Sequence, residues 1–293
     1  SSAASDVYKR QVNGLSNLTA DATYGAAATA FNDTIATSVS YSSNSSNNST
    51  TLATLQAAIV PSGSTIALTS GTDNAAGTAY GDTFTGTMSS TLTDIDRVSG
   101  STGNDTFKIT LGAAGTVVPL SITDVETVRL TGATGAAANT LDVKYATGLT
   151  LLEFNDVTTT AGATHTITGI TSPSIPLQVK NATATTTTLN FTHAAAGLTG
   201  TADTVGLTLT DNGTSAAYVA AVQVNTAGIE GLTVASTGSA NYITNLTTAG
   251  DVKTLTITGS APLTVTTLGG ADSSLTKIDA TAASGGVNID TSF

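Results

Sequence analysis

The stretch Asp251-Val252-Lys253-Thr254-Leu255-Thr256-Ile257-Thr258-Gly259 contains the pattern that decides the fold. Two apolar residues, Leu255 and Ile257, lie two positions apart. A turn-forming residue lies four positions before Leu255, and another lies four positions after it. Apolar residues at period two between turn formers are the signature of a short β-strand. This stretch therefore predicts one strand with a buried face and a polar face.

The same pattern occurs seven times between residues 124 and 282. The spacings between successive patterns are 24, 25, 30, 25, 23 and 23 residues, and self-similarity at a period of about 20–50 residues indicates a repeat architecture. Further apolar positions between the patterns supply a second strand in each repeat. The first apolar residues of the seven patterns are Val128, Leu152, Leu177, Leu207, Leu232, Leu255 and Ile278.

Two architectures fit strands at this spacing. A β-sandwich would place strands about 8–12 residues apart, whereas a parallel β-solenoid stacks equivalent positions of successive repeats. The fixed offsets of the apolar pair and its turns favour the solenoid. We therefore predict a mainly β chain, a parallel β-solenoid with about seven rungs, preceded by a short helical segment. Residues between the paired apolar positions, such as Arg129 and Glu153, are expected to face outward.

Composition excludes several classes of function. The net charge is −11 with nine Lys and Arg residues, so the basic footprint of a nucleic-acid-binding protein is missing and an anionic membrane would repel the chain. There is no apolar run long enough for insertion into a membrane. Cysteine is absent, which excludes disulfides and thiolate metal sites. An acidic surface with few charges is compatible with hard cations such as calcium.

Four segments are expected along the chain. Residues 1–11 differ in composition from the rest of the chain and look like a non-native leader. Residues 12–60 have helical periodicity around a Ser/Asn-rich loop, and we interpret them as the remnant of a helical module with a linker; a disordered linker is the alternative. Residues 61–120 contain Gly/Asp turns that we expect to bind calcium. Residues 121–293 form the solenoid, which we expect to be truncated at its C-terminus because solenoids need capping repeats.

The strongest local motif lies at residues 100–108, Gly-Ser-Thr-Gly-Asn-Asp-Thr-Phe-Lys. It fits the calcium-binding nonapeptide G-G-x-G-x-D-x-U-x except for Ser101 at the second glycine position. Glycines allow the tight turn, the aspartate supplies a hard oxygen ligand and the apolar residue enters the core. A degenerate copy lies 23 residues earlier, at residues 77–85, with Tyr80 in place of a glycine.

Further aspartates lie in adjacent turns and would complete the six to eight oxygen ligands that calcium needs. The alternative interpretation is that all of these residues belong to ordinary Asp/Gly turns. The predicted calcium ligands are Asp73, Asp82, Asp94, Asp96, Asp105 and Asn104.

Residues 70–73, 81–87, 94–100 and 103–106 together resemble bacterial surface-layer (S-layer) proteins with RTX-like calcium-binding repeats. The phrases at 123–128 and 228–234 are similar to the strand-opening phrases of their solenoids. The resemblance implies calcium binding, type I secretion and self-assembly into a lattice on lipopolysaccharide. The family's C-terminal repeats rich in the nonapeptide are missing from this sequence.

The sequence thus predicts an extracellular structural protein of the cell surface. We expect it to self-assemble into an S-layer lattice or filament stabilised by calcium, with lipopolysaccharide contacted through a region outside this sequence. The alternative is a calcium-dependent repeat adhesin, and a remote one is a polysaccharide lyase or hydrolase. We predict that the chain is not an enzyme, because His165 is expected to face solvent, His193 to open a loop, and neither has a triad or zinc pattern around it.

Overall fold

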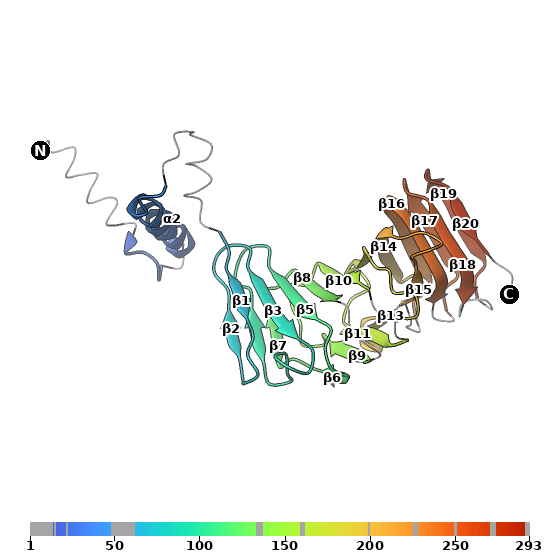
Figure 1. The fold of residues 1–293 in the computed structure, drawn as a ribbon, viewed down its shortest axis with the longest axis horizontal. Coiled ribbons are helices and arrows are strands. Elements are labelled where there is room, and N and C mark those ends of the chain that lie inside the picture. The colour runs from blue at the N-terminus through green and yellow to red at the C-terminus, as the bar shows by residue number, and fades with distance from the viewer. Residues whose placement is uncertain are drawn as a thin grey trace, which may run out of the picture.

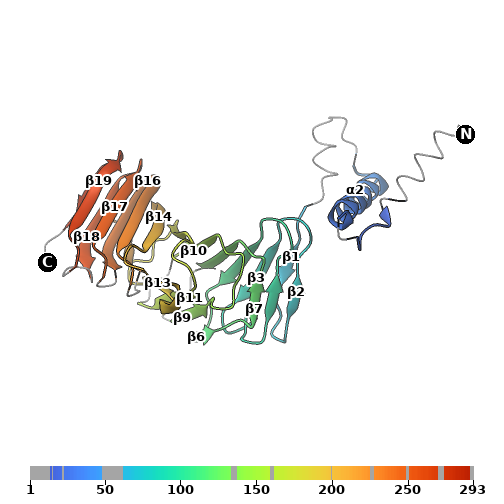
Figure 2. The same ribbon diagram turned by 180° about the vertical axis from the view of Figure 1, so that it is seen from behind.

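A computed structural model describes residues 14, 16–21, 23–47, 62–132, 137–158, 162–198, 200–224, 228–248, 251–269 and 274–290. The described chain consists of an N-terminal helix, α2 (Gly25–Ser43), followed by an elongated β-structure in which the paired strands are parallel (Figure 1). The helix lies at one end, and the last strands, β19 and β20, lie at the other (Figure 2). The prediction of a parallel β-solenoid behind a helical segment is confirmed.

The first stack of parallel strands runs the full length of the solenoid. Its strands contain the predicted apolar pairs, and seven of them, from β8 onward, correspond to the predicted rungs. It consists of β1 (Thr65–Ala67), β3 (Thr83–Thr87), β5 (Thr106–Thr110), β8 (Thr127–Gly132), β10 (Leu151–Val157), β12 (Leu177–Lys180), β14 (Thr204–Asn212), the first part of β16 (Gly231–Thr248), β17 (Thr254–Gly259) and β19 (Lys277–Ala283).

A second stack closes the coils from the other side. It consists of β6 (Gly115–Val117), β9 (Asn139–Asp142), β11 (Thr164–Ile170), β13 (Thr188–His193), β15 (Val219–Val224), the second part of β16, β18 (Leu263–Gly269) and β20 (Val287–Ile289). A short third sheet contains β2 (Asn74–Ala76), β4 (Arg97–Ser99) and β7 (Ser121–Thr123) in the N-terminal coils. One 3-10 turn, η1 (Ala195–Gly197), comes after β13.

The first apolar residues of the seven patterns stack as the spacing predicts, with one exception. Leu152 pairs with Leu177, which pairs with Leu207, as predicted. The next step is displaced by two residues, because Val205 rather than Leu207 pairs with Leu232. Strand β14 buries apolar residues at 205, 207 and 209, so two registers two residues apart keep the same face inside. The period-two pattern alone cannot choose between them.

The core is a continuous column of Val, Leu, Ile and Phe between the two stacks. Phe84 lies over Phe107, and Phe154 packs against Phe191 of the opposite stack with ring centroids 5.0 Å apart. Burying each such side chain stabilises the fold by about 1.5–3 kcal/mol, so the thin core gains its stability by repetition along the stack.

The N-terminal region agrees in part with its prediction. Helix α2 lies within the predicted helical module, residues 12–60. Its Asp33 lies near Tyr80 in the second coil, and burial together with this carboxylate raises the pKa of the tyrosine. The predicted leader, residues 1–11, and the second helix expected at residues 51–59 lie outside the described residues.

Candidate calcium-binding turns

Three of the predicted calcium ligands are buried at the starts of strands. Asp82 and Asp105 immediately precede β3 and β5, and Asp96 immediately precedes β4. Because successive coils are stacked in register, these residues form columns along the solenoid. The columns lie at the corners between the third sheet and the first stack, and at the start of the third sheet.

The first carboxylate column consists of Asp82, Asp105 and Glu126. The backbone N–H of Asp82 donates to Oδ1 of Asp105 at 2.6 Å, and the N–H of Asp105 donates to Oε2 of Glu126 at 2.6 Å. The N–H of Ser64 donates in the same way to Oδ1 of Asp82 at 2.5 Å. Each carboxylate thus accepts the hydrogen bond of a backbone N–H in the preceding coil, which would otherwise lack a partner.

The second carboxylate column consists of Asp73 and Asp96. The N–H of Asp73 donates to Oδ1 of Asp96 at 2.9 Å, and the N–H of Thr93 donates to Oδ2 of Asp96 at 2.7 Å. Asp73 in turn accepts from the N–H of Thr69 at 2.7 Å. These bonds are those of the Asp/Gly-turn interpretation, in which the aspartates order the backbone.

The two remaining predicted ligands lie at the surface. Asp94 is exposed and accepts the N–H of Val118 through Oδ1 at 2.6 Å. Asn104 is exposed in the turn before Asp105, and its backbone carbonyl lies against Gly81 of the coil before. The structure therefore distributes the six predicted residues over several turns, and in the described residues it contains no group of three or more His, Cys, Asp or Glu side chains arranged for a metal.

The turns at residues 77–82 and 100–105 differ in one hydrogen-bonded position. In the first turn, Thr78 donates its N–H at 2.6 Å and its hydroxyl at 3.1 Å to Oδ2 of Asp82. In the second, Ser101 has a left-handed φ of +76°, and Oδ2 of Asp105 is buried without a hydrogen-bond partner. The departure from the nonapeptide motif at residue 101 thus coincides with an unsatisfied carboxylate oxygen in the same turn.

The surroundings of Asp105 are acidic and tightly packed. Burial raises the pKa of Asp105, the N–H of Asp82 opposes that shift, and the carboxylates of Glu126, Asp82 and Asp124 raise it further. A side chain at residue 100 would come within 2.4 Å of Oδ2, so glycine is required there. Among the three buried aspartates, Asp105 alone keeps an oxygen free to bind a hard cation. The residues fit calcium at this point in part, with Asp124 and Glu126 as the nearby carboxylates.

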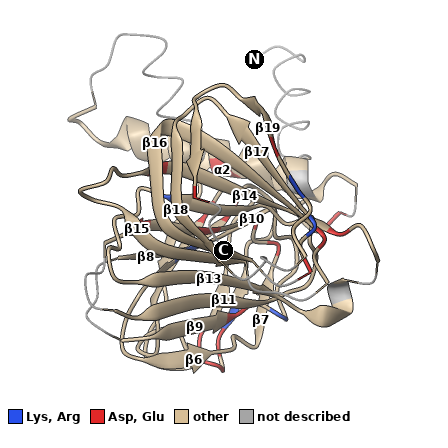
Figure 3. Cartoon of the chain, turned by 90° about the vertical axis from the view of Figure 1, so that its right-hand side faces the viewer, with Lys and Arg blue, Asp and Glu red and all other residues tan. Residues whose placement is uncertain are grey.

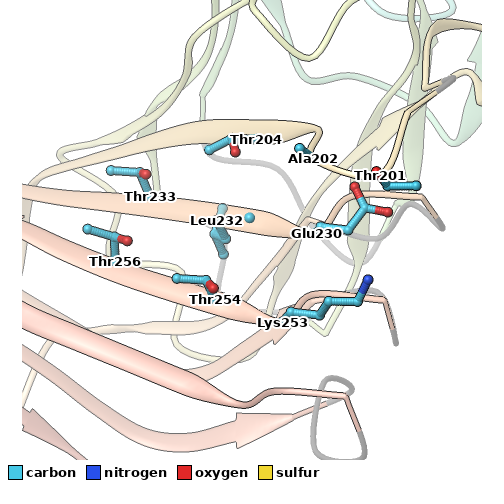
Figure 4. Close-up of a pocket in the computed structure, with 10 residues that line it drawn as sticks. Thr201, Ala202, Thr204, Glu230, Leu232, Thr233, Lys253, Thr254 and Thr256 are labelled. Atoms are coloured by element: carbon cyan, nitrogen blue, oxygen red, sulfur yellow. The ribbon is translucent and has the colours of Figure 1, made fainter.

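Sequence reasoning did not predict a hollow on the outer face of β14, β16 and β17 (Figure 4). Its volume is about 380 Å³, and Glu230 and Lys253 lie at one end of it (Figure 4). The register explains it, because Thr204 pairs with Gly231 and Gly231 pairs with Thr254, so one side chain is missing from a row of threonines. A glycine at an outward threonine position was the available signal. The threonines that line it are Thr201, Thr204, Thr233, Thr254 and Thr256.

The prediction that His165 faces solvent is wrong. His165 is fully buried in β11, because it lies two positions before the inward Ile167 and therefore shares its face. His193 does not open a loop but ends β13, and it is also buried. Burial lowers the pKa of both histidines, that of His193 to about 4. Both ring nitrogens of His165 lack a hydrogen-bond partner, so this residue is a core side chain and not part of a triad.

Arg129 and Glu153 lie on the outer side of the first stack, as predicted, and they form an ion pair. The Glu153 side chain is 2% exposed and the Arg129 side chain is 35% exposed. Charged residues are few over the whole chain and lie mainly at the turns (Figure 3). A second ion pair, between Lys277 and Asp279 at 2.9 Å, lies in β19 of the same stack.

Comparisons of the chain with protein-family models, curated proteins and solved structures found no match. In the part of the chain that the structure describes, no helix has the length and apolar character needed to cross a bilayer.

Proposed function

We propose that this chain is a structural protein of the bacterial cell surface that self-assembles into an S-layer lattice or an extracellular filament, stabilised by calcium. The observation that carries the proposal is the column of carboxylates at residues 82, 105 and 126, in which Oδ2 of Asp105 is buried and unpartnered. A structural role also agrees with the position of most described Asp and Glu residues in turns between strands.

Calcium would act through the turns. Bound at Asp105, with Asp124 and Glu126 near, it would neutralise repulsion among carboxylates that now raise the pKa of Asp105. A ligand that binds the folded chain alone stabilises it by mass action. Residues 77–105 would therefore be ordered more strongly when calcium is present, and the same ions could bridge acidic subunits.

Assembly would use the unpaired edge of the last described coil. In β19 the column of Leu232 and Leu255, each 1% exposed, continues as Ile278, which is 39% exposed because no further described coil covers it. Parallel strands with free N–H and C=O groups can pair with another strand. The partner is either a second copy of this chain or further sequence of the same protein.

The proposal is tested by electron microscopy of the purified chain in millimolar calcium and then in chelator. Ordered sheets or filaments that dissolve on chelation are the expected result. Monomers with the same circular dichroism spectrum in both conditions would contradict calcium-driven assembly of this segment.

The alternative proposal is a calcium-dependent repeat adhesin. The hydroxyl-lined hollow of Figure 4, with Glu230 and Lys253 at one end, favours it because such a surface suits a polar ligand. An adhesin would stay monomeric in the same microscopy experiment and would bind a ligand as a monomer. A lattice protein would assemble without any ligand other than calcium.

A further inference from the structure

Two tyrosine rings lie side by side on the outer face of the second stack. Tyr218 immediately precedes β15 and Tyr242 lies in β16, with ring centroids 5.8 Å apart and ring planes inclined by 47°. Val219 pairs with Ile243, so the two tyrosines occupy equivalent positions in adjacent coils. Both side chains are partly exposed. In a chain with 4% aromatic residues and no tryptophan, this pair is a local concentration of ring surface.

The column of the two rings continues into a polar hollow. Tyr242 pairs with Thr264, and Thr264 pairs with Asn288, so ring, hydroxyl and amide succeed one another at the strand spacing of about 4.8 Å. The hollow has a volume of about 340 Å³ between β18 and β20, and its polar lining residues are Thr264, Thr266, Asn288 and Asp290. An aromatic platform therefore borders a recess that contains two hydroxyls, an amide and a carboxylate.

We propose that this surface, the tyrosine platform with its adjoining hollow, binds a neutral glycan. A sugar presents an apolar C–H face and a rim of hydroxyls. The rings of Tyr218 and Tyr242 would contact the C–H face, because aromatic side chains bury apolar area while staying compatible with water. The side chains of Thr264, Asn288 and Asp290 would exchange hydrogen bonds with the hydroxyls, and such convergent polar groups fix orientation in a binding site.

The charges around the platform favour a neutral ligand over an anionic one. The described residues of β15, β16, β18 and β20 contain no Lys or Arg, and the hollow itself contains Asp290. With a net charge of −11 on the chain, a polyanion would meet repulsion without a compensating cation. A second copy of this chain is the competing occupant, and binding measured on the monomer separates it from a glycan.

The experiment is native affinity electrophoresis of the purified chain in gels that contain dextran, laminarin, yeast mannan or alginate. The first three probes are neutral and the fourth is anionic. We expect at least one neutral polysaccharide to retard the wild-type chain, and alginate to leave its mobility unchanged. Tyr242→Ala is expected to weaken retardation at least tenfold, whereas Tyr242→Phe, which keeps the ring, is expected to retain it within about threefold.

Tyr145→Ala is the matched control. Tyr145 is 54% exposed and lies outside the platform, so its removal is expected to leave retardation unchanged. Circular dichroism and melting temperature verify that each variant folds, and Asn288→Ala is a second test that spares the rings. The proposal is overturned if no neutral polysaccharide retards the wild type, or if Tyr145→Ala weakens retardation as much as Tyr242→Ala does. It is also overturned if Tyr242→Ala abolishes self-association but leaves retardation unchanged. Retardation is measured on the monomer, so it is independent of whether the lattice forms.

Discussion

In the N-terminal coils and in the later coils alike, a buried side chain accepts the backbone N–H of a residue in the preceding coil. The acceptor is a carboxylate in the N-terminal coils and an amide in the later ones. In the N-terminal coils, Asp105 accepts the N–H of Asp82 from the preceding coil. In the C-terminal coils, the buried amide of Asn241 accepts the N–H of Asn212 at 3.0 Å, and Oδ1 of Asn212 accepts the N–H of Ala182 at 3.1 Å. The carboxylate version responds to protons and cations. The amide version is fixed, because asparagine does not titrate.

The difference arises from the groups that surround each oxygen. The two N–H groups of the Asn241 amide are shared among three acceptors, Ser236 Oγ at 2.8 Å, the carbonyl of Thr237 at 3.1 Å and the carbonyl of Leu209 in the preceding coil at 3.1 Å, so the amide is satisfied on both its oxygen and its nitrogen. Asp105 has one satisfied oxygen and one orphaned oxygen. A neutral network adds rigidity, whereas an incomplete charged one leaves a place for an ion.

The largest effect is expected from breaking the amide column. Asn241→Ala would leave the N–H of Asn212 and the carbonyl of Leu209 buried with fewer partners, at about 1–3 kcal/mol each. We expect the free energy of unfolding to fall by about 4 kcal/mol, measured by urea denaturation. Asn190→Ala is the control, because its amide makes bonds of 3.3 and 3.5 Å on the outer face, and it should cost less than about 1 kcal/mol. Equal losses in both variants would contradict the special role of the column.

Asn241→Asp would convert the amide column into a carboxylate column. The substitution keeps an acceptor oxygen but introduces a buried charge, so the pKa of the new carboxyl should be raised. The variant should be less stable than wild type at pH 7 and should recover part of the loss as the pH falls toward about 4. Urea denaturation at several pH values measures this, and a flat difference across the range would contradict it.

The buried histidines of β11 and β13 should make the folded chain less stable in acid, which is opposite to the effect of a buried carboxyl with a raised pKa. The pKa of His193 is about 4 in the folded chain, below its ordinary value of 6.5, so the folded state favours the neutral ring. The contribution of the neutral His193 ring to the free energy of unfolding is fully present above about pH 6.5. It is lost as the pH falls toward 4, and the loss is about 3 kcal/mol. The melting temperature from about pH 7.5 to 4 measures this loss. His193→Gln should flatten the profile, and an unchanged profile in that variant would assign the acid response to other groups.

Removing one carboxylate should loosen the N-terminal coils alone. Asp82→Ala takes the acceptor from the N–H groups of Ser64 and Thr78, and we expect a local loss of about 2 kcal/mol. Because repeat proteins open locally, hydrogen exchange should accelerate in β1 and β3 and stay unchanged in β17. Asp94→Ala, at an exposed aspartate that accepts one N–H, is the control. Uniform acceleration along the solenoid would contradict the prediction.

Asp105→Asn is expected to change the melting temperature least of all these variants when calcium is absent. When calcium is present, it is expected to remove the stabilisation that calcium gives. The amide oxygen can still accept the N–H of Asp82, and the repulsion that raises the pKa of Asp105 is relieved. The melting temperature in chelator should therefore stay the same or rise slightly. In millimolar calcium the wild type should gain stability and the variant should not; equal gains would place calcium elsewhere.

The fold was predictable because the period-two pattern with its turn residues repeats along the chain. Equivalent positions of such a repeat stack on one another in successive coils. The pattern left the register at β14 undecided, since a shift of two residues keeps the same side chains inside. His165 was predicted to lie on the wrong face of its strand, although it lies two positions before the inward Ile167 and therefore shares its face. The hollow at Gly231 and the contact between Tyr218 and Tyr242 depend on which residues meet across coils, and the chain order does not show this until the register is known.

The stacked register tolerates very different lengths of chain between equivalent residues. Leu177 and Leu207 are paired thirty residues apart, whereas Leu232 and Leu255 are paired twenty-three apart, so the seven additional residues are accommodated at the corners of one coil. Such a corner is a natural insertion point for evolution and for engineering. A foreign peptide of similar length placed between β13 and β14 would be displayed at the side of the rod, at a height fixed by the strand spacing, while the coils above and below keep their alignment.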